Sequence, residues 1–186
     1  MITVRHNISL FLVIACMVIS QHAFAQRTVA GRGAPMLSAV YTGSSYGVHA
    51  GWTGWTLWGN WNAGAFGRMY SNPVDETYRL EHSHVGVESE AMFRVLSTRS
   101  RMFSLYLGGG AFIGAELVDP RGVLPDWMSL QTERNRFLYG IHGAAEMDLY
   151  ILKRLSVGIR GTIPISFSSS FGWLNWETGL VLRFDI

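Results

Sequence analysis

Two histidines separated by one residue, His82 and His84, are the side chains whose type and spacing best suit chemistry. On an extended strand such residues face the same side, so their imidazoles could share a metal ion or supply a general base. No cysteine, third histidine or well-placed carboxylate completes the set, since Glu81 faces the other side and Glu88 lies further along the strand. We therefore predict polar residues at a strand end, with no metal or cofactor.

A second chemical pattern follows directly, in the hairpin from Val85 to Leu117. In its first half, small or apolar residues alternate with Glu88, Glu90 and Arg94, and after a polar break at Ser97 to Ser100 the alternation resumes. A period of two predicts strands rather than helices. Each run reaches the roughly 9–11 residues that a tilted strand needs to cross a bilayer, so we predict a transmembrane hairpin.

The same alternation recurs along the chain and predicts an all-β fold with eight strands. Besides the hairpin, the expected strands are Met36–Thr42, Tyr46–Trp55, Trp61–Tyr70, Arg134–Leu152, Leu155–Ser166 and Trp173–Ile186. Gln26 to Pro35 is expected to be an irregular lead-in, and Gly59-Asn60 a turn. Pro164 has no N–H for a ladder, so we expect it near a strand end or a bulge.

The N-terminal residues 1–25 have the features of a secretory signal peptide. Arg5 precedes an apolar run from Ile8 to Ile19, and Ala23-Phe24-Ala25 forms a cleavage site. A lipoprotein signal ending at Cys16 is the alternative, but the apolar run continues past that cysteine. Residues 26–186 then form one domain without cysteine, which excludes disulfides and thiol chemistry.

The composition of residues 26–186 favours a membrane barrel. No apolar run is long enough for a transmembrane helix, so a closed barrel is the architecture that would satisfy the backbone in lipid. Charges are nearly balanced, with 14 Lys or Arg against 13 Asp or Glu, which does not favour nucleic-acid binding. The predicted fold is an eight-stranded antiparallel transmembrane β-barrel in the outer membrane, in contact with outer-membrane lipid. A soluble barrel of lipocalin type, with its apolar face inside, is the alternative.

If the barrel spans the membrane, the charged face of each strand points into the barrel. An interior of eight strands is just wide enough to be filled by side chains, and buried charges must pair. We therefore predict a plugged polar lumen, with a proton or ion path as the alternative; His49 and His142 are expected in the same network. The expected lumen residues are Arg68, Glu88, Glu90, Arg94, Glu116, Arg136, Glu146, Asp148, Arg160, Glu177 and Arg183.

Blocks of residues along the chain resemble the TraO family of conjugative-transposon transfer proteins of Bacteroides-type bacteria. The resemblance covers the chain from just after the signal peptide nearly to its end, and departs from the family in the Trp-rich segment Trp52 to Trp61 and in the long loop. The blocks that carry it are Gln26-Arg27, Tyr46 to Gly51, Phe93 to Arg101, Phe103 to Gly108, Phe137 to Gly140 and Gly179 to Phe184.

The resemblance implies a non-enzymatic outer-membrane component of a conjugative DNA-transfer apparatus, related to type IV secretion, whose partners are other apparatus proteins. Its contact surfaces would be the loops Ser71–Thr77, Val118–Glu133 and Phe167–Gly172, with Trp127 and Met128 as apolar contacts. One alternative is a generic structural or adhesive barrel. Another is a lipid A-modifying barrel enzyme that would use His82 and His84.

Overall fold

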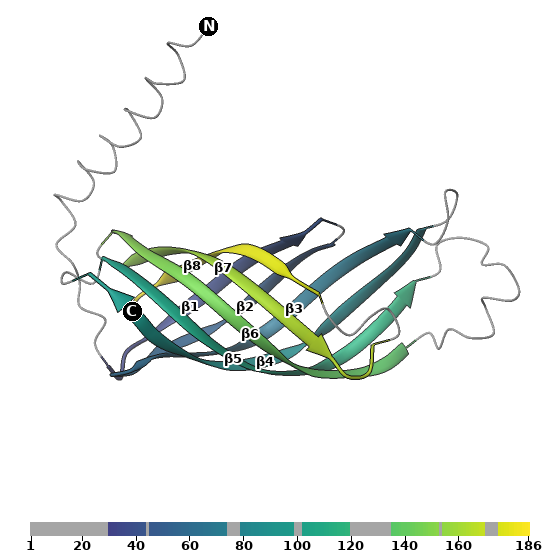
Figure 1. Ribbon diagram of the computed structural model, residues 1–186, viewed down its shortest axis with the longest axis horizontal. Coiled ribbons are helices and arrows are strands. Elements are labelled where there is room, and N and C mark those ends of the chain that lie inside the picture. Colours follow the sequence, from purple (N-terminus) through teal and green to yellow (C-terminus); the bar gives the residue numbers. More distant parts are fainter. Residues whose placement is uncertain are drawn as a thin grey trace, which may run out of the picture.

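The chain forms one closed barrel of eight strands in which each strand pairs with its neighbours in sequence (Figure 1). The computed structural model describes residues 30–43, 45–73, 79–98, 102–119, 135–152, 154–169 and 175–186. All pairs are antiparallel, and β8 closes the barrel against β1. The strands are β1 (Gly33–Thr42), β2 (Ser45–Trp55), β3 (Gly59–Pro73), β4 (Arg79–Ser97), β5 (Phe103–Asp119), β6 (Asn135–Leu152), β7 (Leu155–Ser166) and β8 (Glu177–Phe184).

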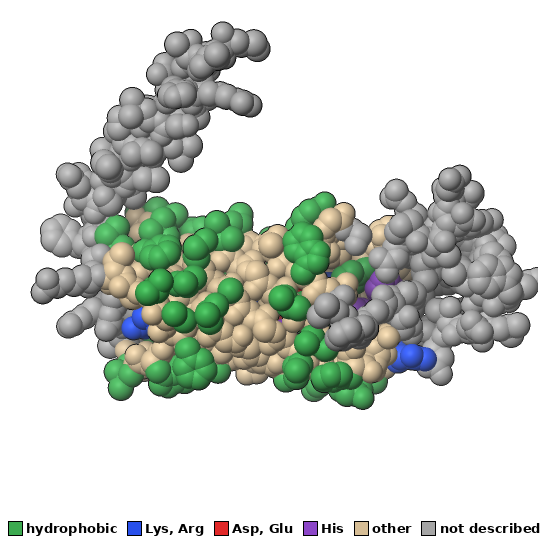
Figure 2. Space-filling view, in the orientation of Figure 1, with side chains coloured by type: hydrophobic (Ala, Val, Ile, Leu, Met, Phe, Trp, Pro, Cys, Tyr) green, Lys and Arg blue, Asp and Glu red, His purple; other side chains and the backbone are tan. Residues whose placement is uncertain are grey.

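The barrel turns its apolar side chains outward and its charged side chains inward. On β6, Ile141, Met147 and Leu149 are exposed, whereas Glu146 and Asp148 between them are buried. This is the reverse of a soluble barrel, so the lipocalin alternative is wrong and the expected barrel with a filled polar interior is confirmed. In Figure 2 the apolar side chains gather towards both ends of the barrel, with a paler band between them. Among the described residues no helix has the length and apolar character to cross a membrane.

The two halves of the barrel wall differ in height. We call β3 to β6, which have 15 to 19 residues each, the long wall. The short wall comprises β7, β8, β1 and β2, with 8 to 12 residues each. β1 begins and β8 ends at one end of the barrel, which we call the terminal end, and the long wall projects beyond the β1–β2 turn at the opposite loop end (Figure 1).

Two sequence expectations about the first strands are wrong. The lead-in does not extend to Pro35, because Gly33 to Pro35 pair with Trp52 to Gly54 and lengthen β1. Gly59 and Asn60 are not a turn but the start of β3, opposite Phe93 and Met92 of β4. A Cβ at position 59 would lie 1.8 Å from the Met92 carbonyl oxygen, so glycine here permits close strand approach rather than a turn.

The expected loops and the last strand also have different bounds. Ser71 to Pro73 belong to β3, and Val118 and Asp119 belong to β5, because pairing with β4 extends both strands. β8 begins at Glu177 instead of Trp173, and β4 begins at Arg79 instead of Val85. Phe167 to Ser169 follow β7 outside the strand, whereas residues 74–77, 120–133 and 170–172 of the expected loops, including Trp127 and Met128, lie outside the described residues, as does the signal peptide.

Pro164 lies near the end of β7, as expected, at a point where its missing N–H costs no ladder bond. β7 pairs with β8 only as far as Thr162, while its pairing with β6 continues through Ser166. The Pro164 carbonyl points away from β6 and accepts a hydrogen bond from the Asn175 backbone N–H at 3.2 Å. The missing N–H lies on this same side, because both backbone groups of a strand residue point the same way.

Two apolar clusters occupy the lumen on either side of its charged middle. Phe66, Phe112 and Leu138 form the cluster nearer the loop end. Trp55, Met92, Tyr106 and Ala144 form the cluster nearer the terminal end. Glu88 and Glu90 of β4 lie between these levels, since Gly86 faces Phe66 and Met92 belongs to the second cluster. Glu88 and Glu90 are therefore enclosed between two apolar layers.

Candidate functional site

The carboxylate of Glu90 on β4 joins three other strands in the lumen. Its Oε1 accepts a hydrogen bond from Asn62 Nδ2 at 2.6 Å, and its Oε2 pairs with Arg160 of β7 and lies 3.0 Å from His142 Nε2. The Glu90 and Arg160 side chains are both 1% exposed. Three partners from β3, β6 and β7 meet at this one carboxylate, so it ties the long wall to the short wall across the lumen.

A second tie runs between β6 and β8 through Arg183. Its guanidinium holds the Glu146 carboxylate in two contacts, from Nη1 at 2.6 Å and from Nη2 at 2.9 Å. Nε donates to Thr53 Oγ1 on β2 at 2.9 Å, and Asp148 lies 3.8 Å from Nη1. Because a bidentate arginine–carboxylate pair fixes orientation as well as distance, Arg183 positions the short strand β8 against both β2 and β6.

Arg68 of β3 lies at the centre of the third group. Nε is 3.0 Å from Glu177 of β8, and Nη2 is 3.3 Å from Glu88 of β4. Its guanidinium carbon lies 4.3 Å from the centroid of the Phe66 ring. The other Glu88 oxygen lies 2.8 Å from His49 Nδ1. This group links β2, β3, β4 and β8.

His82 and His84 lie at the loop end of the lumen, where both are buried. The His82 ring stacks on Tyr70 with centroids 4.9 Å apart. His84 Nε2 lies 3.0 Å from Glu116 Oε2, so the expectation that no carboxylate stands beside the histidine pair is wrong. The adjacent strand supplies Glu116, which pairs with His84 in the β4–β5 register.

The chemistry that this loop-end group can perform is limited by the order of its members. Ser169 Oγ donates to Glu116 Oε2 at 2.7 Å, and the same oxygen faces His84. A nucleophilic serine needs an imidazole within hydrogen-bond reach as its base, with the carboxylate behind that imidazole. Here the carboxylate lies between the hydroxyl and the ring. No cluster of three metal-ligating side chains suited to an ion occurs among the described residues.

Of the eleven expected lumen residues, the structure places Glu116 beside His84 and eight others in the three ion-paired groups, namely Arg68, Glu88, Glu90, Glu146, Asp148, Arg160, Glu177 and Arg183. Arg136 is half-buried and lies opposite Glu116 in the β5–β6 register. Arg94 is half-buried and lies apart, with its guanidinium carbon 5.9 Å from the centroid of Tyr106. The neutral partners Asn62 and Thr53 were not expected as members. Their inward register, shared with Glu90 and His49, is the signal that could have identified them.

At the terminal end the lumen closes on Asp185, just past β8. Its Oδ2 accepts a hydrogen bond from Tyr150 Oη at 3.0 Å. Burial raises the pKa of the Asp185 carboxyl above its usual range. Filled by these groups and by two apolar clusters, the lumen can brace the wall, and among the described residues its middle is closed by buried side chains.

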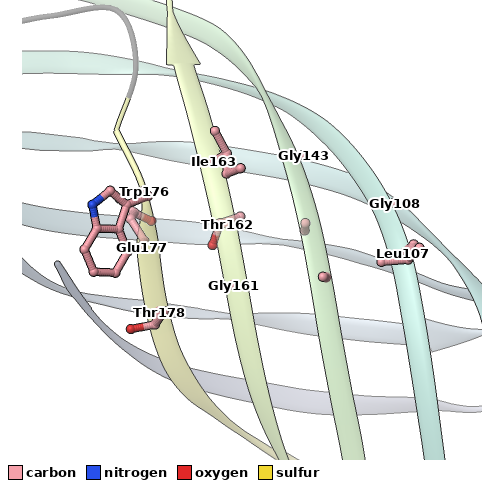
Figure 3. Close-up of a pocket in the computed structure, with 11 residues that line it drawn as sticks. Leu107, Gly108, Gly143, Gly161, Thr162, Ile163, Trp176, Glu177 and Thr178 are labelled. Atoms are coloured by element: carbon pink, nitrogen blue, oxygen red, sulfur yellow. The ribbon is translucent and has the colours of Figure 1, made fainter.

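The exterior carries a shallow groove halfway up the wall, across β5, β6, β7 and β8 (Figure 3). Its floor is formed by small residues, including Gly143, Ala145 and Gly161, and Trp176 stands at its edge with 61% of its surface exposed.

Comparison with known proteins supports this architecture. No curated protein sequence matches the chain. The N-terminal β-barrel domain of OprF from Pseudomonas aeruginosa is similar in structure, with a TM-score of 0.50 and 10% identity over 84% of this chain and 98% of that domain. Ail, the attachment invasion locus protein of Yersinia pestis, gives a TM-score of 0.43 at 13% identity, over 84% of this chain and 99% of Ail.

The likeness to the OprF domain shows the fold alone. The family model described as conjugative transposon protein TraO matches residues 33–186, which is the whole barrel and the residues up to the C-terminus. The resemblance found in the sequence blocks is thereby confirmed. The chain belongs to the TraO family of conjugative transposon proteins.

Proposed function

We propose that this protein is a non-enzymatic outer-membrane component of a conjugative DNA-transfer apparatus, acting by assembly with other transfer proteins. The observation that carries the proposal is the barrel with its apolar face outside and its charges inside, in a chain of the TraO family. Lipid would cover the outward face, and the braced lumen would make the barrel a rigid platform. Residues 1–25 would direct export and then be removed.

The filled lumen supports a platform rather than a channel. Its charged middle lies between two apolar clusters, and its largest side chains, including Arg160, Arg183 and Tyr106, are 1% exposed. Moving an ion or a nucleic acid through this space would require breaking buried ion pairs, which is costly. The function would therefore reside in the ends and the outer surface. The loop segment with Trp127 and Met128 remains one proposed contact surface.

The geometry at the loop end favours this role over lipid A modification. The Glu116 carboxylate lies between the Ser169 hydroxyl and the His84 ring, whereas a nucleophilic serine in a triad has the imidazole next to it and the carboxylate behind. Replacing His82 and His84 with alanine should leave lipid A unchanged, as measured by mass spectrometry. A change in lipid A acylation in that variant would favour the enzyme.

The test of the proposal is deletion and complementation in a strain that carries the transposon. Deletion should abolish or strongly reduce DNA transfer, and the restored protein should fractionate with the outer membrane and migrate differently on gels before and after boiling. Normal transfer without the gene would favour the second candidate, a generic structural or adhesive barrel. Recovery from the inner membrane, or no shift on boiling, would overturn the proposed location.

A further inference from the structure

The terminal end of the barrel carries apolar side chains that the lumen does not use. Large aliphatic residues stand exposed at each connection there and at the C-terminus: Leu57 (87%), Leu96 (59%), Leu152 (61%) and Ile186 (68%). Arg32 and Arg154 are exposed at the same end. We call these six residues the terminal rim.

Two β-bulges help to build the terminal rim. The β4–β5 register shifts between Arg94 and Leu96, and the β6–β7 register shifts between Tyr150 and Leu152. Consecutive side chains of a regular strand face opposite sides, yet Val95 and Leu96 are both exposed, at 51% and 59%. Each bulge thus re-aims a leucine outward immediately before a connection, a use of bulges that is common next to functional surfaces.

Leu57 is presented by a braced turn between β2 and β3. The Thr56 backbone N–H donates to the Gly59 carbonyl oxygen at 2.9 Å, and the Gly59 N–H donates to Thr56 Oγ1 at 3.0 Å. Trp58, the next residue, packs on Phe93 with ring centroids 4.9 Å apart. The turn is held in place while Leu57 itself remains uncovered.

The terminal rim lies at or beyond the edge of the lipid-facing band. On β4 the outward register is polar at Glu81 and Ser83 and becomes apolar at Val85. The ten steps along the strand from Val85 to Val95, each rising about 3.3 Å at a tilt of about 40°, span about 25 Å, the height of the apolar band in such barrels. Leu57 lies level with Val95 at this edge, because Arg94, the neighbour of Val95, donates its N–H to the carbonyl of Trp58.

Leu152 of β6 lies beyond the start of the neighbouring strand β5. The N–H of Tyr150 donates to the Met102 carbonyl oxygen at 2.9 Å, so Leu152 passes the point where β5 begins. Polar headgroups and water would leave such leucines uncovered, whereas an apolar protein surface would cover them. Arg32 and Arg154 add positive charge at this end, whereas the nearby Asp185 is buried.

The connections at the terminal end are short, and outer-membrane barrels place their short turns on the periplasmic side. We propose that the terminal rim docks an apparatus protein on that side, through a partner surface that combines apolar side chains with carboxylates. The inference rests on the proposed function and adds to it a surface and the chemistry of the partner. The leucines would supply buried contact area, and the arginines would set orientation and association rate through opposite charge.

The test places a photo-crosslinking amino acid, p-benzoylphenylalanine, at position 57 or 152 in cells that carry the transposon. Positions 87 and 159 on the lipid-facing wall are the matched controls. We expect protein adducts at 57 and 152 that appear only when the other transfer genes are present, and lipid adducts at 87 and 159. Arg154→Glu should lower the protein adduct at 152 about fivefold, because a rim charge would then oppose the partner's carboxylates.

Lipid adducts at all four positions would overturn the proposal and assign the rim to headgroups. Protein adducts that form without the transfer genes, or that are indifferent to Arg154→Glu, would overturn it as well. A Leu57→Ser/Leu152→Ser double variant should reduce transfer at least tenfold at a normal level of heat-modifiable barrel, whereas Leu117→Ser at the loop end should not. Wild-type transfer by the double variant refutes the docking rim, while wild-type transfer after gene deletion refutes the proposed function itself.

Discussion

The long and short walls of the barrel are held together by different forces. In the long wall, β4 pairs with residues Gly59 to Pro73 of β3 on one side. On the other side its residues Glu81 to Ser97 pair with β5, so backbone hydrogen bonds run along nearly the whole length of β4. In the short wall, β8 has eight residues and meets β1 only from Met36 to Tyr41. Side chains compensate there, because Arg160 and Arg183 reach from β7 and β8 to carboxylates on the long wall.

This difference shows why charges are placed inside a barrel that does not conduct. A short seam between β8 and β1 would fray if only its backbone ladder held it, and a bidentate ion pair in a dry interior resists that opening. The ion pairs stabilise the wall and also specify its register, because each arginine contacts its carboxylate in one strand register only. Substitutions should therefore lower the free energy of unfolding more where side-chain ion pairs hold the wall together than where the backbone ladder does.

The largest effect is expected from Arg183→Met, which leaves Glu146 and Asp148 buried without their cation. Removing one partner of a buried pair costs about 3–5 kcal/mol, so folded barrel should be scarce or its urea midpoint much lower. The folded fraction on unboiled gels measures this. Arg154→Met makes the same chemical change at an exposed site and should leave the free energy of unfolding within about 0.5 kcal/mol of the wild-type value.

Combining Arg183→Met with Glu146→Gln sharpens the comparison. If the two groups interact, the double variant should recover part of the loss, with a coupling free energy of about 0.5–3 kcal/mol. Additive losses in urea unfolding would show that Arg183 acts on β8 through packing alone.

A somewhat smaller loss, about 3 kcal/mol, is expected from Glu90→Leu, which removes the carboxylate that pairs with Arg160. Asn62, His142 and Arg160 would lose their common partner, but leucine fills part of the space. Heat-modifiability midpoints would measure the loss, with Ser89→Leu on the outward face as the control. An unchanged midpoint for Glu90→Leu would show that this face of β4 is not inside the barrel.

In the long wall His84→Ala should cost only about 1 kcal/mol, because the paired strands hold the site and Glu116 keeps its bond from Ser169. Thermal unfolding of the variant in the same detergent would be compared with that of Arg183→Met. A loss as large as that of Arg183→Met would remove the distinction between the walls.

The smallest effect concerns pH at the terminal end. Since burial raises the pKa of Asp185, its contribution to stability is fully present below about pH 4, the usual Asp range, and is lost as pH rises through the raised pKa. Asp185→Asn should flatten the stability profile over this window by less than about 1 kcal/mol. A profile that keeps its slope would assign the dependence to other groups.

Much of this architecture follows from the alternation of residues alone. Period-two patterns predict all eight strands and which side chains point outward or into the lumen. They do so because each face of a strand meets one environment, either apolar or filled with paired charges. The sequence could not give pairing partners, since these depend on register between strands. Thus Glu116 beside His84, and Asn62 and Thr53 in the network, became visible only when the strands were aligned.

The errors at strand ends have a related cause. Glycine and proline at Gly33, Pro35 and Gly59 favour turns when read locally, yet pairing with a neighbouring strand extends β1 and β3 through them. Local preference was outweighed by ladder hydrogen bonds from residues distant in sequence. The terminal rim was missed for the same reason, because the bulges that expose Leu96 and Leu152 exist only between paired strands.

Spin labels placed in turn along β7, in outer membranes, would test the central claim most directly. We predict that labels at Val157, Ile159 and Ile163 collide with oxygen but not with a water-soluble nickel reagent, because lipid covers them. Labels at Gly158 and Thr162 should collide with neither, because the lumen is filled. Nickel access at the first set would contradict a membrane-spanning wall, and nickel access at the second would contradict a closed lumen.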